Sequence, residues 1–441
     1  MGTVSEVASL IERHDIDQVV IAAKDPDGLG RQLIDSCTSN PVRFRILPDI
    51  ESMLASTDGI RDVRDLELTD LLPRQTVKTD LDAVAGLLAG KRVMVTGGGG
   101  SIGSEIVRQI LRFDPEVVLA VDHDETLLHE AALRWQVNAE APFELLVGDI
   151  RDWHRMERLF ERHRPEIIFH AAALKHVPLQ QENPEEAFKT NVLGTQVLLD
   201  AAREHGVEHF VLISTDKAVE PSSVMGATKR MAEMILQTRA AQSESCTYSA
   251  VRFGNVLGSR GSVVPTFKQQ IQAGGPVTVT HPDMERYFMT VDEAVQLVLQ
   301  AAALADRGEV FVLDMGQPVK ILDLANRMIR LQGLVPGRDI EVQLGRPRPG
   351  EKLSETLAGV PLTPSAHRKV MKARPGFPGA ATLHDAVELL HRLADEGDAD
   401  GVRETLLAMA KEEWSDSEVV DLTGDTARVV PFRRRTSTEA R

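Results

Sequence analysis

The sequence predicts an α/β protein built on a doubly wound parallel sheet, and three observations support this fold class. Short apolar segments alternate with amphipathic helical segments almost throughout, an order typical of a parallel sheet with helices on both faces. A glycine-rich turn joins one of these apolar segments directly to a helix. Of the 441 residues, 42% are hydrophobic and 26% are charged, so a sizeable core can form.

The first part of the chain has the element order of one small strand–helix–strand layer. An apolar strand is expected at 18–23, an amphipathic helix around 28–38 and a second strand at 43–47. Residues with mixed charge and turn formers follow, so we place the main boundary near residue 90. Residues 1–90 are therefore expected to form a partial, Rossmann-like domain.

Three further segments follow that boundary. Residues 91–260 are expected to form a complete Rossmann domain with five or six parallel strands. The alternation then loosens and Gly- and Pro-rich loops appear, so 261–413 predict a smaller lobe that sets substrate choice, with C-terminal helices. Residues 414–441 predict a disordered tail, whose three consecutive arginines could be solvated or could touch anionic lipid. The strands expected in the main sheet are 92–96, 117–122, 143–147, 167–171, 210–214 and 249–253.

Charge, cysteine content and hydropathy exclude several classes of protein. The chain has 50 Lys and Arg against 66 Asp and Glu, a net charge of −16, so nucleic acid is not expected as a partner. Cys37 and Cys246 form no Cys-x-x-Cys pair, so neither a disulfide framework nor a zinc site is indicated, which fits a reducing cytoplasm. No apolar run approaches the roughly 18 residues that span a bilayer, so no membrane span is expected in this chain.

A glycine turn after the strand at 92–96 predicts a dinucleotide site. Gly97, Gly100 and Gly103 have the spacing that lets the backbone turn tightly, approach a pyrophosphate and pack the next helix on the strand. A flexible loop is the alternative. The dinucleotide is favoured because the next strand ends at Asp122, about 20 residues on, where a carboxylate would hold the adenosine ribose.

The residues around Asp122 favour NAD over NADP. Asp122, Asp124 and Glu125 would repel a 2′-phosphate, and the three residues after Asp122 include no Arg or Lys to balance one. Asp149 follows the next strand, where it could contact the adenine amino group or cap a helix.

Five motifs give the chain a family resemblance; they lie at 96–103, 170–178, 190–192, 214–218 and 252–256. They resemble the extended short-chain dehydrogenase/reductase superfamily and, within it, the UDP-N-acetylglucosamine 4,6-dehydratases of the polysaccharide-biosynthesis (CapD-like) family. The resemblance covers 91–360 strongly. It is weak over 1–90, where 61–72 look like part of the family's CoA-binding-like domain.

The resemblance implies a location and a cofactor site. Long members of the family carry transmembrane helices before that domain, and this chain has none. We expect either that a native transmembrane region has been removed or that the chain is a relative without one, in the cytoplasm or, if the native protein is longer, at the cytoplasmic face of the inner membrane. The residues that match the family's NAD-binding positions are Thr96, Gly97, Gly100, Ser101, Ile102, Gly103, Asp122, Asp149, Ile150, Ala171, Ala172, Asn191 and Lys229.

The chain departs from the superfamily pattern at one catalytic position. Members normally place Tyr-x-x-x-Lys on a helix, so that both side chains reach the ribose and a substrate hydroxyl. Here the spacing is kept from Met225 to Lys229, but a thioether cannot move a proton. Neither Tyr248 nor Tyr287 has a lysine four residues later. A catalytically inactive NAD-binding homologue is one interpretation; long family members that resemble this chain in having Met there favour an enzyme.

Thr215, Asp216 and Lys217 follow a predicted strand at the sheet edge where open α/β sheets place their chemistry. After oxidation at carbon 4, the family's reaction needs a base for the carbon 5 proton and an acid for the carbon 6 hydroxyl. We expect Lys217 as the base and Asp216 as the acid, with Thr215 and Asp216 binding the carbon 4 hydroxyl and Lys229 the nicotinamide ribose. A surface ion pair is the alternative.

A UDP-sugar needs cations for its diphosphate and amides for its uracil. Each candidate arginine could instead be an ordinary surface charge. The histidines, including His170, His176, His205 and His209, lack metal-ligand spacing, so no metal site is expected. The resemblance and the charges indicate Asn255, Arg260, Arg286 and Arg348 as substrate contacts, with Lys175 near the sugar and Glu351 near the uridine ribose.

The resemblance therefore implies an NAD-dependent UDP-N-acetylglucosamine 4,6-dehydratase for glycan synthesis. It would oxidise carbon 4, eliminate water across carbons 5 and 6 and return hydride to carbon 6, with retention at carbon 5 expected from the Met-bearing branch. A UDP-sugar 4-epimerase and a non-enzymatic NAD-binding sensor are the alternatives. A homo-oligomer is expected, in which helices near 184–205 and 224–240 could pair between protomers, or could pack within one chain.

Overall fold

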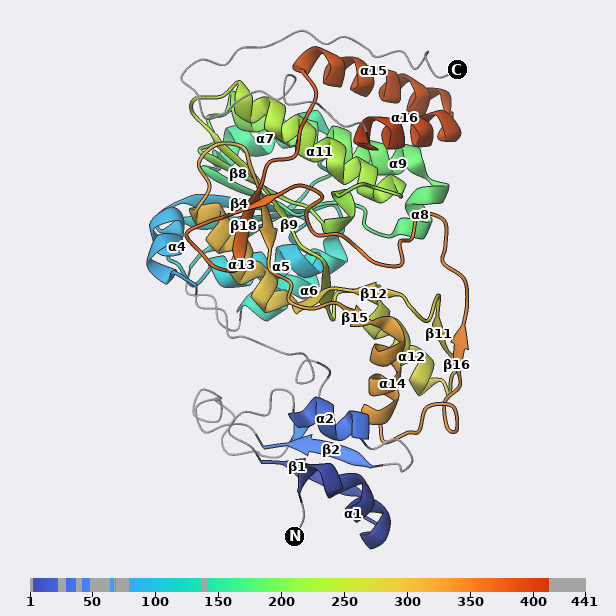
Figure 1. Cartoon of the computed structure of the whole chain (residues 1–441). Coiled ribbons are helices and arrows are strands. Elements are labelled where there is room, and N and C mark those ends of the chain that lie inside the picture. The colour runs from blue at the N-terminus through green and yellow to red at the C-terminus, as the bar shows by residue number, and fades with distance from the viewer. Residues whose placement is uncertain are drawn as a thin grey trace, which may run out of the picture. The chain divides into compact units, whose positions relative to one another are not determined.

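The computed structural model describes residues 3–22, 29–36, 42–47, 64–66, 68, 79–136 and 141–411. The chain divides into two compact units and enters each of them more than once (Figure 1). The expected tail at 414–441 and most of the motif at 61–72 lie outside the described residues. The first unit comprises Met1–Thr76, Val256–Thr290 and Gln317–Pro347, and the second comprises Val77–Asn255, Val291–Gly316 and Arg348–Arg441.

The second unit is built on a sheet that has nine strands in the described residues. They are β4 (Arg92–Thr96), β5 (Val117–Asp122), β6 (Phe143–Val147), β7 (Ile167–His170), β8 (His209–Ile213), β9 (Thr247–Arg252), β14 (Glu309–Leu313), β17 (Leu362–Pro364) and β18 (Val370–Ala373). The order is β17-β18-β14-β9-β8-β7-β4-β5-β6, parallel from β14 to β6 and antiparallel at β18 and β17. The chain winds outward from β4 in both directions, which confirms the predicted doubly wound sheet.

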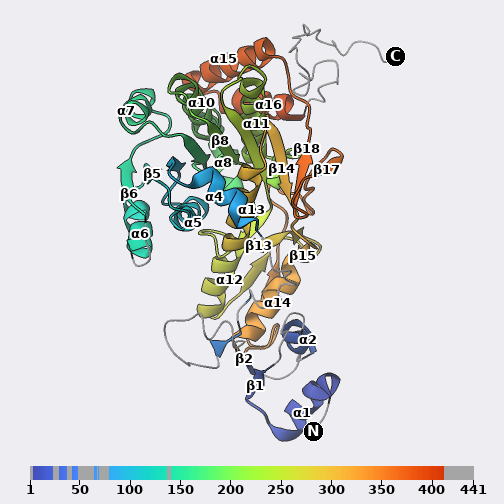
Figure 2. The same ribbon diagram turned by 90° about the vertical axis from the view of Figure 1, so that its left-hand side faces the viewer.

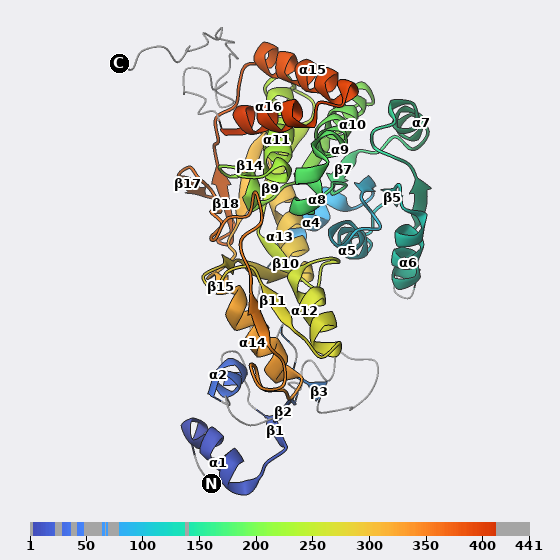
Figure 3. The same ribbon diagram turned by 90° about the vertical axis from the view of Figure 1, so that its right-hand side faces the viewer.

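Helices cover both faces of this sheet, as Figures 2 and 3 show. One face carries α4 (Leu81–Leu88), α5 (Ser101–Ile110), α6 (Glu125–Gln136) and α13 (Val291–Ala303). The other carries α7 (Trp153–His163), α10 (Gly194–Glu204) and α11 (Val224–Ala241), with α15 (Ala380–Glu396) and α16 (Ala399–Lys411) packed outside. Because α16 packs directly on α11, the apolar surface of α11 is buried within the chain.

The six strands expected in this sheet are present, and three more complete it. β14 is a buried Glu-Val-Phe-Val-Leu strand that pairs in parallel with β9, and β18 and β17 extend the sheet beyond it. These three strands fall within 261–413, which was expected to form one separate lobe. The segment is instead divided between the two units, because the open edge of β9 is completed by strands from later in the chain.

The first unit contains the strand–helix–strand layer expected near the N-terminus. β1 (Gln18–Ile21) and β2 (Arg43–Ile46) are parallel, with α2 (Leu29–Ser36) between them in the chain. Asp35 on α2 forms an ion pair of 2.9 Å with Arg327, which joins this layer to the later part of the unit. That later part holds α12 (Val263–Gln272), α14 (Ile321–Leu331) and the strand pairs β11 (Val277–Val279) with β16 (Val342–Leu344) and β12 (Glu285–Arg286) with β15 (Val319–Lys320).

Within the described ranges, no helix is both long enough and apolar enough to cross a membrane.

A buried ionic network fixes α11 to the strand ends of the second unit. The Glu233 carboxylate is fully buried and accepts hydrogen bonds from Arg252 (2.6 and 2.7 Å), Arg230 (3.2 Å) and the Ser214 hydroxyl (2.6 Å). Burial alone would raise the pKa of Glu233, but the Arg252 and Arg230 charges and the hydrogen bonds hold it below its ordinary value. Arg230 and Arg252 also donate to the backbone carbonyls of Gly376 and Ala358. The network thus joins α11, β8, β9 and the C-terminal segment.

Replacing Glu233 should destabilise the protein strongly. Glu233→Ala leaves two buried guanidinium groups without their carboxylate, which we expect to lower the free energy of unfolding by about 3–5 kcal/mol. Chemical denaturation measures this loss. Glu388→Ala, at an exposed position on α15, should change the same quantity by about 0.5 kcal/mol or less. Equal effects of the two substitutions would contradict the importance of the network.

Candidate functional site

The candidate site lies at the carboxyl ends of β4 and β7, where the strand order reverses. β4 has β5 on one side and β7 on the other, so the connections after β4 and β7 lead away to opposite faces of the sheet. Open α/β sheets bind ligands in the crevice that this divergence creates. The glycine turn predicted from the sequence follows β4 at this edge, between Thr96 and α5.

The glycines of the turn are required by close backbone contacts. Gly97 has a φ of +71°, and a Cβ there would lie 2.6 Å from the backbone N of Ala172. A Cβ on Gly103 would collide with the carbonyl oxygen of Gly97. α5 therefore starts against the turn itself, with its N-terminus at the sheet edge. This local geometry matches the one expected of a pyrophosphate-binding turn.

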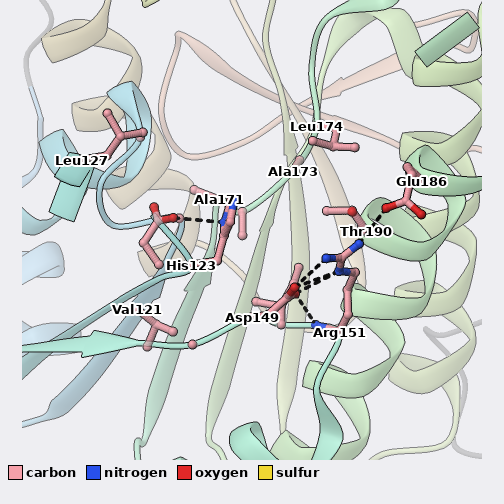
Figure 4. Close-up of a pocket in the computed structure, with 16 residues that line it drawn as sticks. Val121, His123, Leu127, Asp149, Arg151, Ala171, Ala173, Leu174, Glu186 and Thr190 are labelled. Atoms are coloured by element: carbon pink, nitrogen blue, oxygen red, sulfur yellow. Dashed lines mark hydrogen bonds and ion pairs between the residues drawn. The ribbon is translucent and has the colours of Figure 1, made fainter. Parts of the chain in front are cut away.

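A cavity of about 330 Å³ opens beside this turn (Figure 4). The predicted cofactor residues that line it are Gly97, Gly100, Asp122, Asp149, Ile150, Ala171 and Ala172. The predicted residues outside its lining are Thr96, Ser101, Ile102, Gly103, Asn191 and Lys229. Lining residues that the sequence analysis did not assign to the site are Val121, His123, Leu127, Gly148, Arg151, Ala173, Leu174, Glu186 and Thr190.

Asp122 ends β5 at the rim of the cavity and is oriented by the backbone. Its Oδ2 accepts a hydrogen bond of 2.9 Å from the Gly99 N–H, and its Oδ1 accepts one of 3.1 Å from the Asp124 N–H. The imidazole Nδ1 of His123 lies 3.3 Å from Oδ1. The carboxylate is therefore tied to the glycine turn, which places it beside the position expected for a pyrophosphate.

Arg151 is a cation in the cavity wall that the sequence analysis missed. Its guanidinium lies between two carboxylates, 2.7 Å from Asp149 and 2.8 Å from Glu186, as Figure 4 shows. Burial alone would raise the pKa of Asp149, but the hydrogen bonds from Arg151 hold it below its ordinary value. Asp149 does not cap α7, because Asp152 accepts the hydrogen bond at the start of that helix. In the sequence, the signal that could have identified Arg151 is its position two residues after the predicted site residue Asp149.

Two predicted residues support the cavity from behind. Thr96 bonds Nδ1 of the buried His170 at 2.7 Å, and Thr195 bonds its Nε2 at 2.9 Å. Burial, with a smaller effect of the Lys229 charge, lowers the pKa of His170 to about 3, so the ring is neutral. Asn191 bonds both the N–H and the carbonyl of Leu174, at 2.8 and 3.0 Å. Asn191 therefore fixes the loop that lines the cavity.

The predicted catalytic triplet forms a compact polar cluster after β8. The Asp216 carboxylate is fully buried, and its Oδ1 accepts from Thr215 Oγ1 at 2.9 Å and from Lys217 Nζ at 2.9 Å. Asp216 Oδ2 is buried with no hydrogen-bond partner in the part of the chain that the structure describes. Lys217 Nζ also donates to Asn255 Oδ1 at 3.2 Å, and Glu355 Oε1 lies 3.7 Å away. The pair thus joins a fully buried Asp216 carboxylate to a partly buried Lys217, 20% of whose side chain is exposed.

Met225 and Lys229 occupy the first turns of α11, one helical turn apart. Both are buried, with 5% and 6% of their surface exposed. Burial lowers the pKa of Lys229 to about 8, although the Glu233 carboxylate opposes this change. Within the described residues the Lys229 ammonium has no hydrogen-bond acceptor, so it can donate to a ligand hydroxyl.

The predicted substrate residues are distributed over both units. Asn255 belongs to the triplet cluster, and Lys175 is exposed on the loop after β7. Arg348 is exposed, and its backbone N–H donates to the Glu351 carboxylate at 3.0 Å. Arg260 and Arg286 belong to the first unit, where Arg286 is buried and donates to the carbonyl of Glu285 at 2.7 Å.

Among the described residues, no group of three or more His, Cys, Asp or Glu side chains is arranged to hold a metal ion.

Comparisons with known proteins agree with this geometry. CapD of Staphylococcus aureus, a capsular polysaccharide biosynthesis protein, is 45% identical over 359 residues, which cover 81% of this chain and 60% of that protein. A UDP-N-acetylglucosamine 4,6-dehydratase (inverting) of Campylobacter jejuni is 34% identical over 61% of this chain and 77% of that protein. The crystal structure of the Thermus thermophilus UDP-glucose 4-epimerase complex with NAD matches with a TM-score of 0.52 and 28% identity, over 61% of this chain and 90% of that one.

The similarity to a protein family covers most of the second unit and part of the first. A family model described as "Polysaccharide biosynthesis protein" matches residues 93–374, from β4 beyond the end of β18. The chain spans about three fifths of the length of CapD. With its extended short-chain dehydrogenase/reductase fold, the chain belongs to the polysaccharide biosynthesis protein family, as its motifs predicted.

Proposed function

We propose that the protein is an NAD-dependent UDP-N-acetylglucosamine 4,6-dehydratase acting in polysaccharide biosynthesis. The observation that carries the proposal is the ion pair between buried Asp216 and partly buried Lys217 after β8, because elimination of water needs an acid and a base side by side. A relative that is 34% identical is named for this reaction. That relative is the inverting enzyme, whereas Met225 is the reason to expect retention at carbon 5.

The chain's residues fit NAD. The glycine turn packs so closely on the loop after β7 that a Cβ on Gly97 would collide with Ala172, and Asp122 is held beside the turn for the adenosine ribose. Asp149, Ala171 and Ala172 line the same cavity, and Lys229 would hold the nicotinamide ribose. When bound, NAD would supply the transient oxidation at carbon 4 and the later reduction at carbon 6. The epimerase structure that resembles this chain contains NAD.

The proposed chemistry begins with the hydrogen bond between Lys217 and Asp216. Moving one proton across its 2.9 Å converts the ammonium and carboxylate into an amine and a carboxylic acid. The Lys217 amine then takes the carbon 5 proton, and the Asp216 acid protonates the departing carbon 6 hydroxyl, which leaves as water. Asp216 Oδ2, which has no protein partner among the described residues, is the oxygen that remains available to a sugar hydroxyl. Thr215 and Asp216 would bind the carbon 4 hydroxyl.

The remaining predicted residues would contact the nucleotide and the sugar of the substrate. Arg348, Arg260 and Arg286 would bind the diphosphate, with Asn255 and Glu351 at the nucleoside and Lys175 at the sugar. A homo-oligomer also stays a prediction, as do the cytoplasmic location and the retention of configuration at carbon 5.

Incubation with UDP-N-acetylglucosamine, followed by NMR of the product, tests the proposed function. A 4-keto-6-deoxy product supports the dehydratase. A 4-epimer of unchanged mass supports a 4-epimerase, and the absence of product supports a binding protein.

Substitutions in the acid–base pair should abolish turnover without releasing the cofactor. Asp216→Asn and Lys217→Ala each remove a proton-transfer group that does not line the cofactor cavity, so we expect kcat to fall by roughly 10²–10⁴-fold or more with NAD still bound. Product formation and the NAD content of the purified protein are the measurements. Asp385→Asn and Lys411→Ala, at exposed positions on α15 and α16, serve as controls. Near-normal rates in either site variant would refute the assignment.

Cofactor affinity should depend on pH through Lys229. Its pKa of about 8 means that the ammonium is charged below this pH and neutral above it, so NAD affinity should fall as pH rises through 8. Of the charged groups around it, Glu233 has a pKa held below its ordinary value and His170 one of about 3, so neither titrates there. Calorimetric titration with NAD on both sides of pH 8 measures the effect. Lys229→Met should bind more weakly without this dependence, whereas Lys411→Met should behave as the parent protein; an unchanged pH slope in Lys229→Met would contradict the prediction.

A further inference from the structure

Glu355 contacts the predicted base, although no motif in the sequence marked it as part of the site. Its side chain is 4% exposed, and its Oε1 lies 3.7 Å from Lys217 Nζ. With Asp216 Oδ1 at 2.9 Å and Asn255 Oδ1 at 3.2 Å, three oxygens from three separate parts of the chain surround one ammonium group. Asp216 and Asn255 accept hydrogen bonds from this ammonium, and the Glu355 carboxylate lies within ion-pair distance of it.

The segment that carries Glu355 is fastened to the loop after the catalytic triplet. Lys352 donates to the carbonyl of Val219 at 2.9 Å, and Ser222 donates to the carbonyl of Gly350 at 2.9 Å. Gly350 also has a φ of +83° and lies against Ser223, so a Cβ there would meet the Ser223 side chain at 2.9 Å. The segment that carries Glu355 is therefore held at several points. These contacts fix the position of Glu355 near Lys217.

We propose that Glu355 is a positioning residue for the dehydration, holding the Lys217 side chain in line with carbon 5. The inference rests on the proposed function. Asn255 accepts a hydrogen bond from Lys217 at 3.2 Å, and the negative charge of Glu355, 3.7 Å away, attracts the Lys217 ammonium before it passes its proton to Asp216 and again after it takes the carbon 5 proton. A long flexible lysine without these two partners would lose alignment with the carbon that it deprotonates.

The position of Glu355 also connects substrate binding with proton transfer. Arg348 and Glu351, the proposed nucleotide contacts, lie on the same segment, seven and four residues before Glu355. Their own hydrogen bond of 3.0 Å closes the turn in which they lie. A nucleotide bound at this turn would therefore be held by the same segment that places the Glu355 carboxylate near Lys217. Segment 348–355 would then contact the nucleotide through Arg348 and Glu351 and influence the reaction at the sugar through Glu355.

A kinetic comparison tests the proposal. Glu355→Gln keeps the size and an oxygen acceptor but removes the charge, and it should lower kcat roughly a hundredfold while KM for UDP-N-acetylglucosamine stays close to that of the parent protein. Glu355→Asp keeps the charge and should retain more activity. Lys352→Gln loosens the same segment but keeps the Glu355 carboxylate, so it should lower kcat less than Glu355→Gln does. Glu388→Gln, exposed on α15, is the control.

Two further measurements separate positioning from a structural role. In Glu355→Gln, oxidation at carbon 4 should proceed while elimination stalls, so the absorbance of reduced nicotinamide should appear in a single turnover. Without substrate, acetic anhydride should acetylate Lys217 faster in this variant than in the parent protein, with Lys411 as the internal reference in peptide mass spectrometry. This labelling uses no sugar, so it decides the Glu355–Lys217 contact even if the parent protein yields no 4-keto product.

The outcomes decide the inference as follows. A fall in kcat with unchanged KM, together with faster labelling of Lys217, supports it. An unchanged kcat, a loss confined to KM, or an unchanged labelling rate overturns it. If Glu355→Gln does not fold by circular dichroism, the same comparisons are made with Glu355→Asp, whose shorter side chain should shift kcat and labelling in the same directions by smaller factors.

Discussion

The burial of one carboxylate, that of Glu233, determines how the reactive part of this protein is assembled. A buried charge is tolerated only when other groups satisfy it, and Glu233 is satisfied by Arg252 on β9, Arg230 on α11 and the Ser214 hydroxyl at the end of β8. Ser214 directly precedes the Thr-Asp-Lys triplet, and Lys229 lies one helical turn before Glu233. The same interaction therefore fixes the strand end that carries the proposed acid–base pair and the helix that carries the lysine proposed for the ribose.

The second unit contains two neighbouring polar clusters, the network around Glu233 and the cluster around Lys217, which differ in how completely their groups are hydrogen-bonded. In the Glu233 network, each side-chain group has a charged or polar partner, which makes it a rigid support. In the cluster around Lys217, one oxygen of Asp216 is buried and has no partner among the described residues. Such a group costs stability and is found where a ligand completes it. The contrast between the complete network and the incomplete cluster indicates where a substrate belongs.

Much of the fold and the cofactor turn was predictable because both are local in the sequence. The apolar runs at 92–96, 117–122 and 143–147 become strands with these bounds, and Gly103 is required by its contact with Gly97 within the same turn. β14 was missed because its place beside β9 depends on pairing between segments distant in the chain. Arg151 and Glu355 were missed for the same reason: their partners, Glu186 and Lys217, are brought to them only by the folded chain.

The interrupted path of the chain has a consequence for biosynthesis. One edge of β9 stays unpaired until β14 emerges from the ribosome. Between these two strands the ribosome translates Val256–Thr290, which belongs to the first unit. The Gly376 carbonyl that accepts from Arg230 arrives later still, after β18 and before α15 and α16. During this interval a long apolar strand edge is open to other nascent chains. The second unit is thus completed only after parts of the first unit have been translated, and until then chaperones that shield strand edges would matter most.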